Sequence, residues 1–364
     1  MTAAPPTDEA RLAWLRLART PNVGPVAFDH LLTRFGSAEA ALDALPRLVR
    51  GGAAPRPPAR EAALAELEAG DRLGATLLLS CEPGFPPLLA ALDPPPPLIW
   101  VLGDATLPAR PAVAIVGARV ASAAGQRFAR ALAVDLGKAG QVVVSGMARG
   151  IDGAAHEGAL ATGGGTVAVL GGGVGDIYPP DHADLHARIV EAGAVVSESP
   201  PDHRAQARDF PRRNRLISGL SRAIVVVEAE LKSGSLITAR LAAEQGREVL
   251  AVPGSPLDPR ARGANDLLRQ GAAVCEGVDD VLRVLEGLGG LREPERRRWS
   301  GPLPDGPDPA LQDRVAALLS PAPVHPDDLV RATGAPPAAV YAALVELSLA
   351  GRAQFTADGQ VCDG

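Results

Sequence analysis

Cysteine and lysine are scarce in this chain of 364 residues. Its three cysteines, Cys81, Cys275 and Cys362, are isolated from one another and are not spaced as metal ligands. This pattern predicts a reducing, cytoplasmic environment and cysteines without a chemical role. Lys138 and Lys232 are the only lysines, so nearly all the positive charge is carried by arginine. Because the net charge is -6, the chain is not basic overall, and any nucleic-acid site must be a local patch.

The motifs of common nucleotide and metal enzymes are also absent. No G-x-x-x-x-G-K-[ST] sequence occurs, which argues against an ATP-driven motor. Neither H-E-x-x-H nor C-x-x-C occurs, and the sequence predicts no metal site. No apolar run reaches about 18 residues, so we expect no membrane span. The first residues lack a basic segment followed by an apolar one, so we expect no signal peptide either.

Sequence patterns divide the chain into three predicted domains and a linker. Residues 1–74 predict a helical module of the SAM or helix-hairpin-helix type, with a tight turn at Val23-Gly24-Pro25. Residues 309–364 predict three helices and a hairpin, the winged-helix plan, after a Pro-, Gly- and Arg-rich linker at 288–308. Charges balance in the first module, and the predicted recognition helix of the last domain has no Lys or Arg. These charges favour a role in protein contacts for both domains, with DNA contacts as the alternative.

Residues 75–287 alternate short apolar runs with helical segments. The runs are apolar throughout, as in strands that are covered on both faces. The predicted fold class is therefore α/β, an extended Rossmann-like, doubly wound and mostly parallel sheet. Strands are predicted at 76–80, 98–102, 113–116, 142–145, 166–170, 194–197, 223–227, 249–252 and 272–275. Ligands of such sheets bind at the carboxyl ends of the strands.

Glycine-rich turns follow four of these strands. They contain, in chain order, Gly117, Arg119 and Ser122; Gly146, Arg149 and Gly150; the glycines at 171–175; and Ser233, Gly234 and Ser235. Arg119 stands where a dinucleotide fingerprint needs its second glycine, so this edge is predicted to bind phosphates without a standard cofactor. Asp152 and His156 lie one helical turn apart in the second turn and its helix. We expect them to cap a helix or to hydrogen-bond in the core, and not to bind a metal.

The most basic stretch precedes the apolar run at 223–227. It holds six arginines against one acid: Arg204, Arg208, Arg212, Arg213, Arg215 and Arg222. We predict a basic, mobile loop around Phe210 that leads into a buried strand. Phe210 is expected to stack on a base and Asn214 to reach a base or sugar edge, a combination that suits a single nucleic-acid strand. The alternative is a structural hairpin, with Phe210 in the core and Asn214 as a turn residue.

Several of these stretches resemble DprA, the DNA-processing protein A family of bacterial natural transformation, also called Smf. The two most specific matches are the sequence that begins at Phe210 and the one that begins at Ser233. The matching stretches, in the family's order, are GARVAS at 117, SGMARGIDGAAH at 145, VAVLGGGVGDIYPPDH at 167, SESPP at 197, FPRRNRLISGLSRAIVVVEA at 210, SGSLITA at 233 and GREVLAVPGS at 246. The terminal modules also resemble those of the longer family members.

The resemblance implies a protein that is not an enzyme, that binds and protects incoming single-stranded DNA, and that loads RecA onto it. It also implies help in displacing the single-strand-binding protein SSB, and a homodimer formed through the Rossmann-like domain. By motif position, Phe210 and Asn214 are joined by arginines that contact phosphates and by turn residues that donate hydrogen bonds. The arginines are Arg119, Arg149, Arg212, Arg213 and Arg215, and the turn residues are Gly117, Ser122, Ser233, Gly234 and Ser235.

Two other functions stay open on the sequence. Gly-rich Rossmann-like sheets with acids such as Glu198 and Glu228 also occur in enzymes that resemble the lysine-decarboxylase-like phosphoribohydrolases, which process nucleotides. The PGGxGTxxE signature of that group lacks its Thr and Glu here. The remaining hypothesis is a protein scaffold that works through the two small domains.

Overall fold

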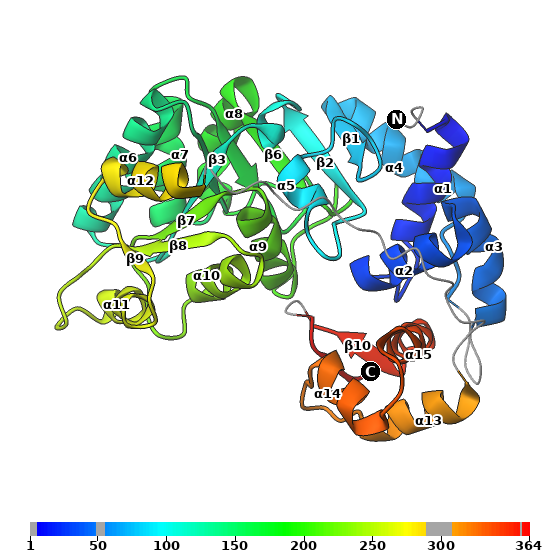
Figure 1. Ribbon diagram of the computed structural model, residues 1–364. Coiled ribbons are helices and arrows are strands. Elements are labelled where there is room, and N and C mark those ends of the chain that lie inside the picture. Colours follow the sequence, from blue (N-terminus) through cyan, green and yellow to red (C-terminus); the bar gives the residue numbers. More distant parts are fainter. Residues whose placement is uncertain (1–5, 49–54, 289–307, 357–358) are drawn as a thin grey trace. The chain divides into compact units, whose positions relative to one another are not determined.

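Strands rich in valine, isoleucine and alanine form a large sheet in the middle part of the sequence (Figure 1). The computed structural model describes residues 6–48, 55–288, 308–356 and 359–364. The larger sheet has the strand order β1-β2-β6-β5-β4-β3-β7-β8-β9. Its strands are β1 (Ala75–Leu79), β2 (Leu98–Gly103), β3 (Ala112–Val116), β4 (Val142–Ser145), β5 (Thr166–Val169), β6 (Ala194–Ser197), β7 (Ala223–Val226), β8 (Glu248–Ala251) and β9 (Ala273–Val274).

The strands from β6 to β9 pair in parallel, and β2 joins β6 in the antiparallel direction with Trp100 opposite Ser197. Every strand that the sequence predicts is present, within one or two residues at each end. The prediction of a mostly parallel α/β sheet is confirmed. Because the parallel strands run in one direction, the segments after β3, β4, β5 and β7 meet at one edge.

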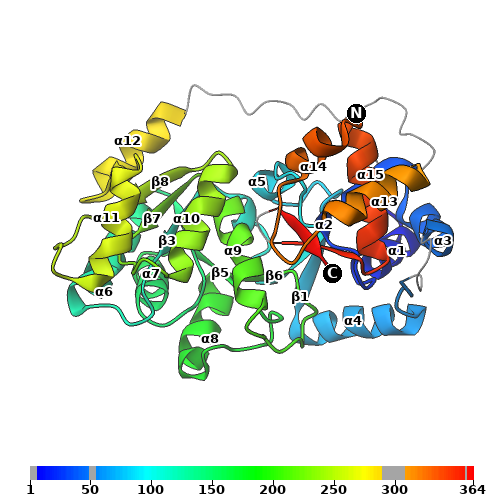
Figure 2. The ribbon, with the colours of Figure 1, turned by 90° about the horizontal axis from the view of Figure 1, so that it is seen from below.

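Helices cover both faces of the sheet, as Figures 1 and 2 show. On one face lie α6 (Ala123–Lys138), α7 (Ile151–Leu160), α8 (Ala183–Ala192) and α12 (Val278–Leu288). On the other lie α5 (Pro87–Ala90), α9 (Asp209–Gly219), α10 (Gly234–Glu244) and α11 (Arg262–Arg269). The 3₁₀ turns are η1 (Leu107–Ala109), η2 (Pro180–His182) and η3 (Pro259–Ala261), and α4 (Arg60–Leu73) precedes β1.

Side chains of the central strands alternate between the two helical layers. In β3, Ile115 packs against α6 and α7, whereas Ala114 and Val116 pack toward α9 and α10. Such alternation follows from the two-residue repeat of a strand. Both faces therefore exclude water, and the polar residues of this domain collect at the ends of the strands.

The segment around Phe210 is the helix α9, so the prediction of a mobile loop is wrong. The structural hairpin that was its alternative does not form either. Pro211 stands in the first turn, where a missing N–H has no intrahelical partner to lose. Leu216 and Ile217 then pack into the core beneath the sheet. The density of arginines in the sequence hid this apolar face.

The chain separates into two compact units. One unit contains Glu66–Leu92 and the described part of Ile99–Glu295, and therefore the sheet. The other contains Asp93–Leu98 and the described parts of Met1–Ala65 and Arg296–Gly364. It holds the predicted winged-helix domain and most of the predicted N-terminal module, of which residues 66–74 lie in the sheet unit. Its elements are α1 (Asp8–Ala18), α2 (Pro25–Phe35), α3 (Ala38–Leu48), α13 (Pro309–Leu318), α14 (Pro326–Thr333), α15 (Pro337–Leu349) and the hairpin β10 (Ala353–Phe355) and β11 (Val361–Asp363). The predicted linker at 288–308 lies almost wholly outside the described residues.

Helix α15 is shared by the two terminal modules. Residues 342–349 are all buried, because α15 packs on the winged-helix core on one side and on the N-terminal helices on the other. Val345 and Leu349 belong to the same apolar cluster as Phe28 of α2. The Glu346 carboxylate also pairs with the Arg34 guanidinium at 3.4 Å. The predicted recognition helix is thus covered over residues 342–349, whereas its first residue, Pro337, is exposed.

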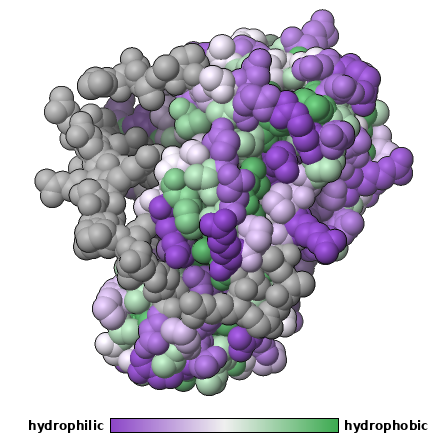
Figure 3. Space-filling view, turned by 90° about the vertical axis from the view of Figure 1, so that its right-hand side faces the viewer, coloured by the Kyte–Doolittle hydropathy of each residue, from purple (hydrophilic) through white to green (hydrophobic). Residues whose placement is uncertain are grey.

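The face drawn in Figure 3 intersperses hydrophilic residues with smaller hydrophobic areas. None of the helices in the described ranges combines the length and the apolarity needed to cross a bilayer.

In the sheet unit, the apolar residues pack between the sheet and the helices, and some helices approach each other closely. Gly158 of α7 lies against α6, where an added Cβ would stand 2.3 Å from the Arg130 carbonyl oxygen.

We therefore expect Gly158→Ala to lower the free energy of unfolding by about 1–3 kcal/mol, because two helix backbones must separate. The matched control is Gly287→Ala in α12, where an added Cβ meets no atom within 4 Å. That change should be neutral or slightly stabilising, because alanine favours helix. Urea unfolding of both variants measures the difference. Equal stabilities would contradict the tight α6–α7 packing.

Candidate nucleic-acid interface

A pocket of about 260 Å³ lies at the carboxyl edge of the sheet. We call it the strand-end pocket. Its walls come from the segments after β3, β4 and β5 and from the start of α9. The residues that line it are Arg119, Val120, Gly146, Ala148, Arg149, Leu170, Gly171, Gly172, Asp176, Tyr178, Pro179, Ala205, Phe210 and Arg213. Three strand ends that are separate in sequence therefore form one site. Of the residues predicted to bind DNA, Arg119, Arg149, Phe210 and Arg213 come together here.

The ring of Phe210 contacts an aromatic ring and a cation in this pocket. Its centroid lies 5.2 Å from that of Tyr178, and the Arg119 guanidinium carbon lies 5.6 Å from the Phe210 centroid. Both Tyr178, which is 47% exposed, and Arg119 are open to solvent. An accessible ring can stack on a base, and an accessible guanidinium can bind a phosphate beside it.

Arg213 forms the floor of the pocket and is 7% exposed. Its guanidinium donates to the Gly146 carbonyl at 2.7 Å and to the Val169 carbonyl, and so joins the ends of β4 and β5. An added Cβ on Gly146 would lie 2.8 Å from the Asp152 carboxylate and 2.9 Å from the Arg213 guanidinium, so both groups approach this glycine closely. Arg213 is therefore held by the fold, and it adds positive charge beneath the site.

Burial acts against the charges of this pair. It lowers the pKa of Arg213 to about 10, and the nearby Asp152 carboxylate opposes that shift. It raises the pKa of Asp152, against the effect of Arg213 and of hydrogen bonds from the Gly146 and Ala148 amides. At neutral pH Arg213 keeps its charge, because a pKa near 10 is still well above 7.

The predicted structural role of Asp152 and His156 is confirmed. The Asp152 carboxylate accepts from the amides of the loop after β4, and His156 Nδ1 lies 2.8 Å from Thr166 Oγ1 in the core. Burial lowers the pKa of His156 to about 3, so this ring is neutral at physiological pH. Met147, in the loop that Asp152 holds, has a left-handed backbone with φ of 61°. Such strain in a non-glycine residue is typical of binding sites.

Arg149 stands at the rim of the pocket. Its side chain is 59% exposed and lies 2.6 Å from the Asp181 carboxylate, which is 69% exposed. An exposed pair of this kind contributes little to stability and exchanges easily for another anion. A phosphate group can therefore replace Asp181 as the partner of Arg149.

Two residues of α9 that were predicted to bind DNA point inward. The Asn214 amide donates to the Gly234 carbonyl at 3.3 Å, which ties α9 to the start of α10. Arg215 binds both carboxylate oxygens of Glu198. Ser233, Gly234 and Ser235 form the N-terminus of α10 beside Asn214, and they are outside the lining of the strand-end pocket.

The remaining cations of the basic stretch face solvent. Arg204, Arg208 and Arg212 are exposed, and they flank the pocket residues Ala205 and Phe210 in sequence. The structure thus divides the six arginines evenly, because Arg213, Arg215 and Arg222 are engaged with protein acceptors. Arg204 and Arg208 were not among the predicted site residues.

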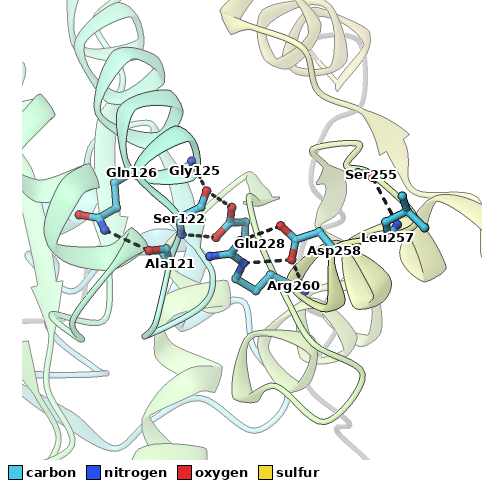
Figure 4. A network of polar contacts seen from close by, with 9 residues as sticks. All are labelled: Ala121, Ser122, Gly125, Gln126, Glu228, Ser255, Leu257, Asp258 and Arg260. Carbon is cyan, nitrogen blue, oxygen red and sulfur yellow. Dashed lines mark hydrogen bonds and ion pairs between the residues drawn. The ribbon is translucent and has the colours of Figure 1, made fainter.

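Gly117 directly follows β3 and Ser122 caps α6, and both serve the local fold. An added Cβ on Gly117 would meet the Ile151 side chain at 2.7 Å. Ser122 caps α6 by accepting from the Gly125 amide at 2.9 Å, and it donates to Glu228 (Figure 4). The two acids on which the enzyme hypothesis depends, Glu198 and Glu228, are therefore both engaged with other residues and do not line the pocket.

Tyr178 and Glu228 also lie at this edge, although neither was among the residues predicted to bind DNA. Tyr178 follows the glycines after β5, and its aromatic character was the available signal. Glu228 stands two residues after β7 and follows the buried Val227, at a strand end where polar side chains face ligands in parallel sheets.

Three family models match the chain. DNA recombination-mediator protein A matches residues 76–286, which is more than half of the chain. The DprA-like N-terminal HHH domain matches residues 8–69, and the DprA winged helix domain matches residues 301–359. Each match overlaps one of the three domains predicted from the sequence.

Known proteins and structures agree with the family models. Protein Smf of Escherichia coli (strain K12) is 42% identical over 271 residues, which are 73% of this chain and 72% of the relative. DNA processing protein DprA of Bacillus subtilis (strain 168) is 41% identical over 202 residues, which are 55% of this chain and 68% of the relative.

Two solved structures are similar as well. DprA from Streptococcus pneumoniae has a TM-score of 0.62 at 28% identity, over 77% of this chain and 98% of that one. DNA processing protein A from Helicobacter pylori, whose structure concerns its single-stranded DNA binding mode, has a TM-score of 0.53 at 30% identity, over 58% of this chain and 96% of that one. The chain therefore belongs to the DNA recombination-mediator protein A family, the family of the DprA and Smf proteins.

Proposed function

We propose that this protein binds single-stranded DNA at the strand-end pocket and loads RecA onto the bound strand. In this proposal it is a cytoplasmic homodimer, formed through the sheet unit, that also assists in displacing SSB and catalyses no reaction itself. The observation that supports DNA binding most directly is the contact of Phe210 with Tyr178 and with the Arg119 guanidinium in one pocket.

The chemistry of the pocket fits a strand better than a free nucleotide. Arg119 and Arg149 of the pocket follow two different strands. The exposed Arg204, Arg208 and Arg212 are close in sequence to its residues Ala205 and Phe210. A single phosphate cannot meet all of them, whereas successive phosphates of a chain can. Because an aromatic ring can stack on any base, such binding does not depend strongly on sequence. The Helicobacter pylori relative binds single-stranded DNA, which supports the same ligand here.

The exposed arginines and the buried Arg213 have different tasks in this proposal. Arg119, Arg149 and Arg212 contact phosphates, and Phe210 stacks on a base with Tyr178. Arg213, Asn214 and Arg215 hold the strand ends and α9 in place. The α10 N-terminus at Ser233, Gly234 and Ser235 lies on the same edge and offers amide donors to a phosphate further along the strand.

Titration of a labelled oligothymidine with the full chain tests the binding proposal. If about four phosphates are neutralised, log affinity should fall against log salt with a slope of roughly -3. Arg119→Ala should weaken binding and reduce that slope by about 0.7, because one phosphate contact is lost. Phe210→Ala should weaken binding by about 5- to 150-fold without changing the slope, because stacking is not ionic.

The control for both variants is Arg283→Ala. Arg283 lies on α12, is 75% exposed and pairs only locally with Asp280. It should bind as the unmodified chain does. Wild-type affinity in both Arg119→Ala and Phe210→Ala would remove the strand-end pocket from DNA binding.

RecA loading is tested by RecA ATPase activity on single-stranded DNA coated with SSB. The protein should shorten the lag before ATP hydrolysis begins, and Arg119→Ala should restore most of that lag because the strand is no longer held. Single-stranded DNA without SSB is the control, where RecA needs no help. If the unmodified protein binds DNA but leaves the lag unchanged, it is a DNA-binding protein without a loading activity.

A further inference from the structure

The loop that carries Arg119 is fixed at both ends. It joins β3 to α6 over residues 117–122. At its first end, the Ile151 amide donates to the Ala118 carbonyl at 3.2 Å. An added Cβ on Gly150 would lie 2.3 Å from the same carbonyl oxygen, so the start of α7 presses against the loop. Arg119 and Val120, which lie between Ala118 and the far end of the loop at Ser122, are exposed.

At the far end the loop is held by a carboxylate from another strand. Glu228 follows β7 and accepts from the Ser122 amide at 2.9 Å and from the Ser122 hydroxyl at 2.5 Å (Figure 4). The Gly125 amide donates to that hydroxyl, so α6, the loop and β7 are joined through one group. An added Cβ on Gly125 would lie 2.6 Å from the Glu228 carboxyl carbon, so only glycine admits the carboxylate here.

The position of Glu228 explains why an acid is tolerated there. The chain runs from β3 through β4 and β5 to β6 on one side and then returns to β7 on the other, so Glu228 lies at the topological switch point. Ligand phosphates of Rossmann folds bind at such a point, on the first helix's N-terminus. Here the Glu228 carboxylate takes the amide that a phosphate would use, and the dipole of α6 favours its charge. Arg260 also lies close enough to interact with Glu228.

We propose that Glu228 is a positioning residue for single-stranded DNA, because it holds the 117–122 loop so that Arg119 faces the strand-end pocket. This inference rests on the proposed function. It predicts the direction in which DNA affinity changes when Glu228 is replaced. Removing a negative charge next to a DNA site should raise affinity if charge alone matters, whereas the positioning role predicts a loss.

The test compares Glu228→Ala with Glu230→Ala in the full chain, using the same oligothymidine. Glu230 is an exposed acid two residues further along the chain. Its replacement by alanine removes the same charge as Glu228→Ala but leaves the Ser122–Glu228 contact in place. Glu228→Ala should weaken binding about tenfold, the loss expected of one charge-assisted contact, and should lower the salt slope by about 0.7. Glu230→Ala should bind as well as the unmodified chain or slightly better.

A double-mutant cycle separates positioning from general damage to the fold. In the Arg119→Ala background, Glu228→Ala should cause no further loss, because the side chain that it positions is gone. A defect of the whole fold would instead add to the Arg119→Ala effect. Hydrogen exchange should also rise at 117–122 while the strands keep their protection.

Glu228→Gln and Ser122→Ala cover the case in which Glu228→Ala does not fold. Each leaves part of the Ser122–Glu228 contact, so each should give a smaller loss with the same non-additivity. Affinity that is unchanged or increased in Glu228→Ala, or losses that add to those of Arg119→Ala, would overturn the inference. Absence of DNA binding by the unmodified chain would instead overturn the proposed function.

Discussion

A single buried guanidinium, that of Arg213, joins the carboxyl ends of β4 and β5 beneath the strand-end pocket. Its burial is costly, and it is compensated by two carbonyl acceptors and by the Asp152 carboxylate. Because Arg213 and Phe210 are three residues apart on α9, they lie on the same side of the helix, and fixing one also fixes the other. The charge under the pocket and the ring in its wall thus depend on one helical turn.

The same edge shows how an arginine-rich segment can be both structural and open to a ligand. Of the α9 arginines, Arg213 and Arg215 bind carbonyls or a carboxylate, whereas Arg212 remains exposed. A Rossmann-like sheet normally offers a phosphate site at its switch point, but here Glu228 occupies the amide of Ser122. The exposed arginines that line the strand-end pocket, Arg119 and Arg149, instead follow β3 and β4.

The sequence predicted the sheet closely because continuous apolar runs such as 142–145 admit few other structures. It also predicted that Arg119, Arg149 and Phe210 belong together, since strand ends of a parallel sheet meet at one edge. It failed for α9, where the arginines concealed the apolar spacing of Leu216 and Ile217. Nor could it separate Arg212 from Arg213, because burial depends on helix orientation, and adjacent residues point about 100° apart.

In the proposed complex, a base of the bound strand lies against Phe210 and Tyr178. This placement can be tested by photocrosslinking of an oligothymidine that carries 5-iodouracil, followed by mass spectrometry of the adducts. We expect adducts on Phe210 or Tyr178 that disappear in Phe210→Ala while adducts elsewhere persist. Adducts confined to the unit that holds α1 to α3 and α13 to α15, with none at the strand-end pocket, would contradict it.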